Sequence, residues 1–269
     1  MPQRDGFEAG VPCWADTAQP DPAAAVEFYK GLFGWEAENV MPADERGEYF
    51  MCTVNGSQAA GVGSQPEGMP PIPVWNTYIN VEGADETAKK VADAGGSVMM
   101  EPFDVMDQGR MAVFADPTGA AFCVWEAKAS TGARVVNEPG ALCWNELTTR
   151  DPDGSKAFYS AVFGWNPQPM EDSPVDYTVW QLPGADADAG VGGMMPMVGD
   201  MWPKDLPPHW MVYIAVEDTD AAAEKAKGLG GKVMVEPFDT PAGKAAVLND
   251  PGGAAFSIIA LSPEAQASA

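Results

Sequence analysis

Apolar and polar positions follow one recurring order along the first half of the chain. Residues Pro12 to Thr17 read as a short strand, and "AAAVEFYKGLFGW" then places apolar residues at helical spacing between Asp21-Pro22, a helix-start signal, and Gly34. "EYFMCTV" and "AAGVG" predict strands. "TYINV" predicts another strand, "DETAKKVADAGG" a helix, and "GSVMM", "RMAVFAD" and "AAFCVWE" three strands. We interpret this as two βαβββ modules.

The second half of the chain repeats the first. Cys143-Trp144 answers Cys13-Trp14 at an offset of 130 residues, and "DPGGAAF" from Asp250 answers "DPTGAAF" from Asp116. We therefore predict two tandem domains, at 8–128 and 138–264, joined by an exposed linker at 129–137 and followed by a disordered tail "SPEAQASA". The pattern leaves open which of the four modules share a sheet.

Composition narrows the classes of partner. The 269 residues carry 15 Lys+Arg against 39 Asp+Glu, a formal charge of -24, which disfavours nucleic acid and anionic membrane surfaces. No stretch reaches the roughly 18 apolar residues of a membrane span, and the four cysteines lack a CxxC pair. We expect a cytoplasmic protein with buried thiols.

The opening "DP…FY…LFGW", the closing "DPTGAAFCVWE" and the module order together resemble the vicinal oxygen chelate superfamily of glyoxalases, bleomycin-resistance proteins and dioxygenases. The likeness is greatest to tandem two-domain actinobacterial members of a hydroxylase-like branch. It implies an α+β fold in which paired modules form an open cupped sheet with helices outside. Function must then be argued from the site.

The resemblance also locates the positions where the family's metalloenzymes hold their metal. In the first domain these positions fall on Trp14, Asn76 and Cys123. In the second they fall on Trp144, Met211 and Ser257. Such side chains do not supply the nitrogen and carboxylate ligands that Zn, Ni, Mn or Fe(II) prefers, so we expect neither a metal nor another cofactor.

Strand alternation places one carboxylate in each domain on the face of its tryptophan, Asp16 beside Trp14 and Glu146 beside Trp144. Both are candidate catalytic acids or bases, or alternatively structural hydrogen-bond acceptors. His209, the single histidine, is a rim residue or a ligand contact. The candidate ligand-binding residues are Trp14, Asn76, Tyr78, Cys123, Trp144, His209, Met211, Tyr213 and Ser257.

Small and flexible side chains complete the candidate lining. The glycines of "AAGVG" and "GVGGMM" are interpreted as leaving room for a ligand or a close backbone. Met194, Met195, Met197 and Met201 read either as a soft lining or as core. Trp35 and Trp165, which follow the two matching helices, are expected to be packing residues.

These features give two leading hypotheses. The first is a metal-free small-molecule binding protein of the glyoxalase/bleomycin-resistance type, which holds a hydrophobic, aromatic antibiotic or natural-product intermediate in one or both cups. The alternative is a metal-independent hydroxylase, isomerase or lyase-like enzyme on a polyketide-type substrate, with Asp16 or Glu146 as acid/base. A metal-dependent glyoxalase or dioxygenase is disfavoured, and homodimer formation stays open.

Overall fold

The computed structural model describes residues 4–267 apart from 44, 67–70, 172, 174, 186–188, 200 and 201, and it confirms four βαβββ modules. The first domain contains β1 (Pro12–Gln19), α1 (Pro22–Phe33), β2 (Glu36–Asn39), β3 (Tyr49–Val54), β4 (Ser57–Ser64), β5 (Val74–Asn80), α2 (Ala84–Asp93), β6 (Ser97–Val105), β7 (Gly109–Ala115) and β8 (Ala121–Ala127). The second contains β9 (Leu142–Thr149), α3 (Pro152–Phe163), β10 (Asn166–Pro169), β11 (Thr178–Gln181), β12 (Gly190–Pro196), β13 (His209–Ala215), α4 (Thr219–Gly228), β14 (Lys232–Thr240), β15 (Gly243–Asn249), β16 (Ala255–Leu261) and α5 (Pro263–Ala267).

The predicted start and stop signals bound the long helices. At the start of α1, the Asp21 side chain accepts a hydrogen bond from the Ala24 backbone N–H (3.0 Å), and Pro22 occupies the first turn. The helix ends at Gly34, whose φ of 73° belongs to the left-handed region that favours glycine. The matching helix α3 is capped in the same way.

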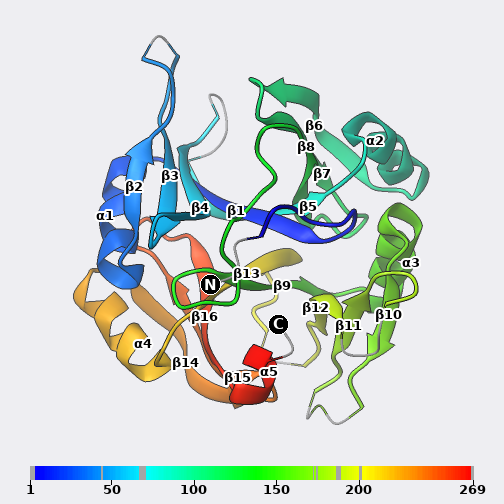
Figure 1. The fold of residues 1–269 in the computed structure, drawn as a ribbon. Helices are drawn as coiled ribbons and strands as arrows, with labels where there is room; N and C mark the ends of the chain where they lie inside the picture. Colours follow the sequence, from blue (N-terminus) through cyan, green and yellow to red (C-terminus); the bar gives the residue numbers. More distant parts are fainter. Residues whose placement is uncertain are drawn as a thin grey trace.

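Consecutive modules share a sheet, which settles the pairing that the sequence left open. The first sheet has the order β2-β3-β4-β1-β5-β8-β7-β6, and the second has the order β10-β11-β12-β9-β13-β16-β15-β14. The modules join where β1 pairs antiparallel with β5, and β9 with β13. Figure 1 shows both sheets curling, with the helices on their outer sides. We call the concave side of each sheet its inner face.

The outer faces form two cores that cross between the domains. In one core α1 packs with α4 and with strands β13, β15 and β16; in the other, α2 packs with α3. Figure 1 shows α1 beside α4 at the left and α2 beside α3 at the right. Edge-to-face contacts of Phe256 with Phe28 and Tyr29 fill the first core.

Buried hydrogen bonds also cross between the domains. Tyr29 Oη donates to Asp250 Oδ2 over 2.9 Å, and Tyr159 Oη donates to Asp116 Oδ2 over 3.2 Å. Both carboxylates belong to the "DPxG" turns, where they also accept backbone N–H bonds. Each of the two matching turns of the repeat is therefore tied to a helix of the other domain.

The tryptophans after α1 and α3 are packing residues, as predicted. Trp35 is 2% exposed and Trp165 is 1% exposed. Their indole N–H groups donate across the domain boundary, from Trp35 to the Gly140 carbonyl (2.7 Å) and from Trp165 to the Gly10 carbonyl (2.9 Å). These bonds satisfy buried polar atoms that would otherwise destabilise the interface.

Two expectations for the connecting segments were wrong. The linker is not simply exposed, because Ala133 and Val135 are buried and the Ala133 N–H donates to the Cys13 carbonyl (2.8 Å). The tail contains helix α5 (Pro263–Ala267), while residues 268–269 lie outside the described part. In that described part, no helix is long and apolar enough to cross a membrane.

Candidate functional site

Cross-strand register defines which residues share each inner face, since directly opposed residues of paired strands point to the same side. In the first domain these residues are Trp14, Asp16, Gly61, Asn76, Tyr78, Met100, Phe103, Met111, Val113, Cys123 and Trp125. In the second they are Trp144, Glu146, Gly193, Met211, Tyr213, Ala215, Val235, Phe238, Ala245, Val247, Ser257 and Ile259. The structure thus brings most of the predicted site residues onto these two faces.

A buried carboxylate lies near the centre of the first inner face. Asp16 is 7% exposed, and its Oδ2 accepts hydrogen bonds from Tyr78 Oη (2.9 Å) and Tyr49 Oη (3.1 Å). Its Oδ1 accepts from Asn76 Nδ2 (2.9 Å). The indole N–H of Trp14 donates in turn to Tyr49 Oη (3.0 Å). Asp16 is therefore the acceptor at the end of a connected network.

The second inner face repeats this network with one change. Glu146 is 6% exposed and accepts hydrogen bonds from Tyr177 Oη (2.8 Å) and Tyr213 Oη (3.1 Å). Trp144 Nε1 donates to Tyr177 Oη (2.9 Å), as Trp14 does to its tyrosine. Met211 replaces the asparagine opposite the carboxylate, so this position supplies no third donor.

Burial dominates the electrostatics of both carboxylates. It raises the pKa of Asp16 and of Glu146, because the charged forms lose hydration, while the phenol hydrogen bonds partly offset the rise. Burial and the adjacent carboxylates also raise the pKa of Tyr49, Tyr78 and the matching phenols well above the usual range. The phenols therefore stay protonated and act as donors.

Sequence reasoning missed Tyr49 and Tyr177, which link each indole to each carboxylate. The signal was present, because both tyrosines occupy the second position of matching predicted strand segments, "EYFMCTV" and "DYTVWQL". The structure also corrects the interpretation of the glycines, since a Cβ on Gly61 would collide with the Tyr49 hydroxyl, and one on Gly193 with that of Tyr177. These glycines make room for a phenol.

Two other predicted site residues are Cys123 and His209. Cys123 packs with Tyr78 on the inner face, and burial raises its pKa, which leaves the thiol unreactive. His209 is half-buried and pairs in register with Thr148, two pairs from Met211–Glu146 and so on the same face as predicted, and its Nδ1 lies 2.8 Å from the Pro207 carbonyl. Burial lowers the pKa of His209. The structure therefore places it outside the carboxylate network.

The predicted methionine lining is mostly core where it is described. Met194 is 1% exposed and belongs to the core on the outer face, and Met197 is 5% exposed. Met195 is half-buried. Met201 lies outside the described residues.

The side chains at the family's ligand positions do not fit a metal centre. Trp14 offers an indole N–H that is already donated, Asn76 donates its amide to Asp16, and Cys123 keeps its proton. Among the described residues, no three His, Cys, Asp or Glu side chains gather closely enough to hold a metal ion. The donor set therefore favours hydrogen bonding over coordination.

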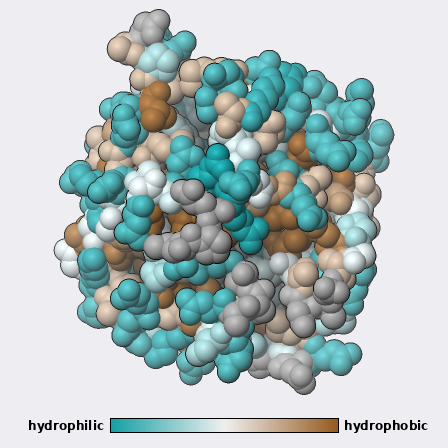
Figure 2. Space-filling model, in the orientation of Figure 1, coloured by the Kyte–Doolittle hydropathy of each residue, from teal (hydrophilic) through white to brown (hydrophobic). Residues whose placement is uncertain are grey.

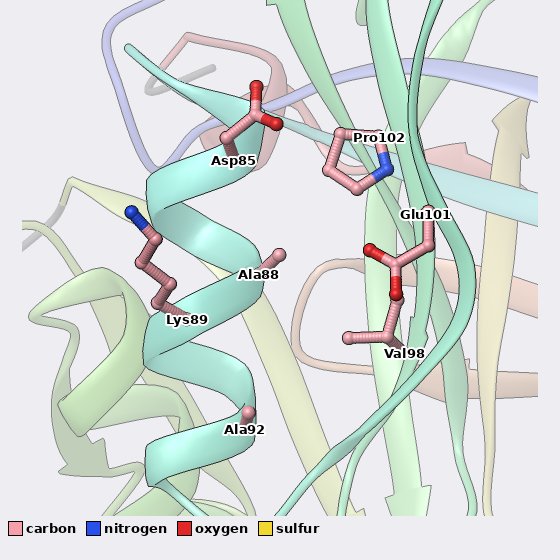
Figure 3. Close-up of a pocket in the computed structure, with 7 residues that line it drawn as sticks. All are labelled: Asp85, Ala88, Lys89, Ala92, Val98, Glu101 and Pro102. Carbon is pink, nitrogen blue, oxygen red and sulfur yellow. The ribbon is translucent and has the colours of Figure 1, made fainter.

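A separate hollow of about 380 Å³ lies on the outer side of the first domain, between α2 and β6. Figure 3 shows Ala88 and Ala92 facing Val98 and Glu101 across it. Its rim carboxylate, Asp85, is held by the Arg110 guanidinium (2.8 Å). This hollow results from small side chains on the helix and adds no chemistry to the inner face.

The surface seen in Figure 2 is mostly hydrophilic, with hydrophobic residues confined to separate patches. This distribution agrees with the formal charge of -24. Most of the exposed face is therefore a solvated acidic surface rather than an apolar docking surface.

Comparison with known proteins agrees with the geometry. The model of the Glyoxalase/Bleomycin resistance protein/Dioxygenase superfamily matches residues 15–124 and 141–258. A Mycobacterium tuberculosis protein named "Putative glyoxylase CFP32" is 45% identical over 272 residues, which cover 98% of this chain and all of that protein. "Anthracycline biosynthesis protein DauV" from a Streptomyces species is 39% identical over 270 residues, or 95% of this chain and 94% of its own.

Solved structures show the same fold at low identity. The Mn(II)-bound glyoxalase from Novosphingobium aromaticivorans superposes with a TM-score of 0.62 at 16% identity, over 94% of this chain and 82% of its own. The 2,2',3-trihydroxybiphenyl 1,2-dioxygenase from Sphingomonas wittichii gives 0.61 at 15% identity, over 94% and 90%. These likenesses concern the fold alone.

Proposed function

Because the chain belongs to the glyoxalase/bleomycin resistance protein/dioxygenase superfamily, we propose that it binds a hydrophobic, aromatic small molecule on one or both inner faces, without a metal ion. The observation that carries this proposal is the composition of the inner faces. Half-buried tryptophans, Trp14 and Trp144, flank a single carboxylate network in each domain. Flat aromatic walls with few polar groups suit a planar ligand.

Partly exposed apolar side chains on the same faces support this reading. Phe103 is 39% exposed, and Phe238 and Val235 are 38% and 47% exposed, although all three share a face with buried neighbours. Covering such side chains stabilises a complex by roughly 25 cal/mol for each Å² of apolar area removed from water. The inner faces therefore retain apolar surface that a ligand can bury.

The chemistry of the ligand is proposed from a relative. DauV, a protein of similar length, is named for anthracycline biosynthesis, which indicates a fused-ring aromatic compound. Such a compound carries carbonyl and hydroxyl oxygens on flat rings. Those oxygens suit the phenols and the carboxyl that the inner faces present.

Mass spectrometry of retained compounds tests the proposal. The purified protein is incubated under air with aromatic polyketides, and with reactive aldehydes as the contrasting class, free compound is removed, and retained and released masses are measured. We expect an unchanged fused-ring compound to stay with the wild-type protein. Phe103→Ser on the first inner face and Phe238→Ser on the second should each weaken retention if the compound binds that face. Retention of no aromatic compound at stoichiometric concentration would contradict the proposal.

The carboxylate networks favour one second candidate, an enzyme without a metal. A carboxyl group whose pKa is raised by burial, and that two phenols contact, is suited to give or take a proton. In this reading Asp16 or Glu146 is the acid/base of an isomerase or lyase-like step.

Conservative variants separate the two candidates. Asp16→Asn and Glu146→Gln keep the size of each side chain but remove its ability to transfer a proton. If a new mass forms with wild-type protein and is lost in either variant while the substrate is still retained, the enzyme is supported. Unchanged product in both variants would remove these carboxylates from any catalytic role.

A further inference from the structure

The hydrogen-bond network of the second inner face has committed all of its donors. Trp144 Nε1 donates to Tyr177 Oη (2.9 Å), and Tyr177 Oη donates to Glu146 Oε2 (2.8 Å). Tyr213 Oη donates to Glu146 Oε1 (3.1 Å). Each phenol or indole has a single hydrogen to donate, so these three side chains keep none for a ligand. The phenol oxygens retain lone pairs, and the network therefore presents acceptors.

The first inner face has nearly the same polarity. Trp14, Tyr49 and Tyr78 donate their hydrogens within the network. Asn76 donates one amide hydrogen to Asp16 (2.9 Å) and keeps the other. Against that one hydrogen stand the lone pairs of two phenol oxygens and of the amide carbonyl. A ligand that meets either network therefore gains most when it donates the hydrogen bond.

Two further polar side chains of the second face do not change this balance. His209 Nδ1 lies 2.8 Å from the Pro207 carbonyl, which only accepts, so Nδ1 carries the hydrogen and Nε2 of the neutral ring is an acceptor. Burial lowers the pKa of His209 and so favours the neutral ring. Ser257 is 1% exposed, which leaves its hydroxyl out of a ligand's reach.

Positive charge is kept away from both networks. Among the described strands, β1 to β16, only Arg110, Lys232 and Lys244 are cationic. Register directs Arg110 and Lys244 to the outer side, where they pair with Asp85 and Asp220 of the helices at 2.8 Å. Lys232 begins the edge strand β14, which is four strands from the strand of the second network, or roughly 19 Å along the sheet.

Negative groups, by contrast, lie on the inner faces themselves. Asp16 and Glu146 are near the centres, and register places Glu38 on the side of Asp16, through Met51 and Gly61. The formal charge of -24 adds a long-range field of the same sign. A carboxylate on the ligand would lose hydration beside these groups without a cation to pair with, a cost that a neutral group of the same shape avoids.

We propose that the inner faces select an uncharged fused-ring aromatic compound whose polar group is a hydrogen-bond donor, such as an alcohol, and that they reject the carboxylate form of the same ring system. The hydrogen is donated to the remaining lone pair of a half-buried phenol, Tyr49 Oη in the first domain or Tyr177 Oη in the second. This inference rests on the proposed function and names the class of ligand that the function takes.

Four anthraquinones that differ in one substituent test the two parts of the proposal. A hydroxymethyl compound and its methyl ether differ in the donor, and a carboxamide and a carboxylate of similar shape differ in charge. Binding to the wild-type protein is titrated at neutral pH by quenching of tryptophan fluorescence. We expect the alcohol to bind about fivefold more tightly than its ether, and the carboxamide roughly tenfold more tightly than the carboxylate.

Cations placed beside the carboxyl groups should remove the discrimination against charge. Asn76→Lys puts an ammonium opposite Asp16, and Met211→Lys puts one opposite Glu146. In the variant of a face that holds the ligand, the preference for the carboxamide should fall to about twofold or less. Ala161→Lys, at an exposed position of α3, adds the same charge on the outer side and should leave the preference unchanged.

Thermal melts identify the variants that are folded, and Asp16→Asn and Glu146→Gln replace any lysine variant that is not, since they remove the charge at constant size. Equal binding of the carboxamide and the carboxylate to the wild type, or of the alcohol and its ether, would overturn the inference while the binding function stands. A fall in the preference with Ala161→Lys as large as with the inner-face lysines would assign it to net charge and also overturn the inference. If none of the four compounds binds, the proposed function fails as well.

Discussion

Each inner face keeps one buried carboxyl group within an aromatic network, and the two copies use different side chains for it. Asp16 accepts three side-chain hydrogen bonds, one of them from Asn76, whereas Glu146 accepts two. In both, burial outweighs these bonds and leaves the pKa raised. The folded protein therefore binds protons at these groups more tightly than the unfolded chain does.

This difference predicts a specific dependence of stability on pH. Above the unfolded pKa of about 4, the folded state holds more protons at these sites, so their contribution to the free energy of unfolding falls as pH rises toward the raised pKa. Each site changes that free energy by at most about 1.4 kcal/mol per pH unit. The double variant Asp16→Asn, Glu146→Gln should show a weaker decline over this range. Urea denaturation between pH 4 and 8 measures it.

Asp85 supplies the control for that experiment. The Arg110 guanidinium lowers its pKa, so its contribution has the opposite sign and is lost on acidification. Asp85→Asn should therefore leave the decline with rising pH unchanged. Identical pH profiles for the wild type and the double variant would show that the two buried carboxyl groups titrate normally.

Individual helices and strands show which parts of the fold the sequence pattern predicts. Capped helices and strands with one apolar face were predicted, because Asp-Pro and Gly mark helix ends and alternation marks half-buried strands. The edge strand β2 (Glu36–Asn39) was not located, since it is short and largely exposed and so carries no alternation. Tyr49 was missed for another reason: it acts on a residue two strands away, a relation that exists only once the sheet has formed.

The glycines of β4 and β12 lead to a prediction about the packing between strands. Gly61→Ala should destabilise the protein by about 1–3 kcal/mol, because the added Cβ would overlap the Tyr49 phenol and also approach the Asp16 side chain. Gly193→Ala should act in the same way through Tyr177. Gly228→Ala, at the end of α4 with open space around it, is the control and should be neutral or slightly stabilising. Equal effects on the urea midpoint at all three positions would contradict the packing argument.

At the scale of the whole molecule, the sequence repeat does not predict which modules pack against each other. Every module offers a helix and strands that each have an apolar face, so hydrophobic pattern alone cannot select which modules meet. The structure selects two pairings at once: consecutive modules share a sheet, while the cores join α1 to α4 and α2 to α3. Neither core belongs to one domain, which should make folding of the two domains interdependent.

That interdependence predicts a single unfolding transition. Tyr29→Phe removes the phenol that donates to Asp250 in the other domain and accepts from the Trp75 indole (2.9 Å), and leaves both partners buried. We expect a loss of about 1–3 kcal/mol and a Tm lower by roughly 2–4 °C for each kcal/mol. Lys30→Ala, on the same helix but in an exposed ion pair, should change little. Calorimetry should give one peak that moves as a whole, since the lost contacts lie in a shared core. Two separated peaks, with only one shifted by Tyr29→Phe, would mean that the domains unfold independently.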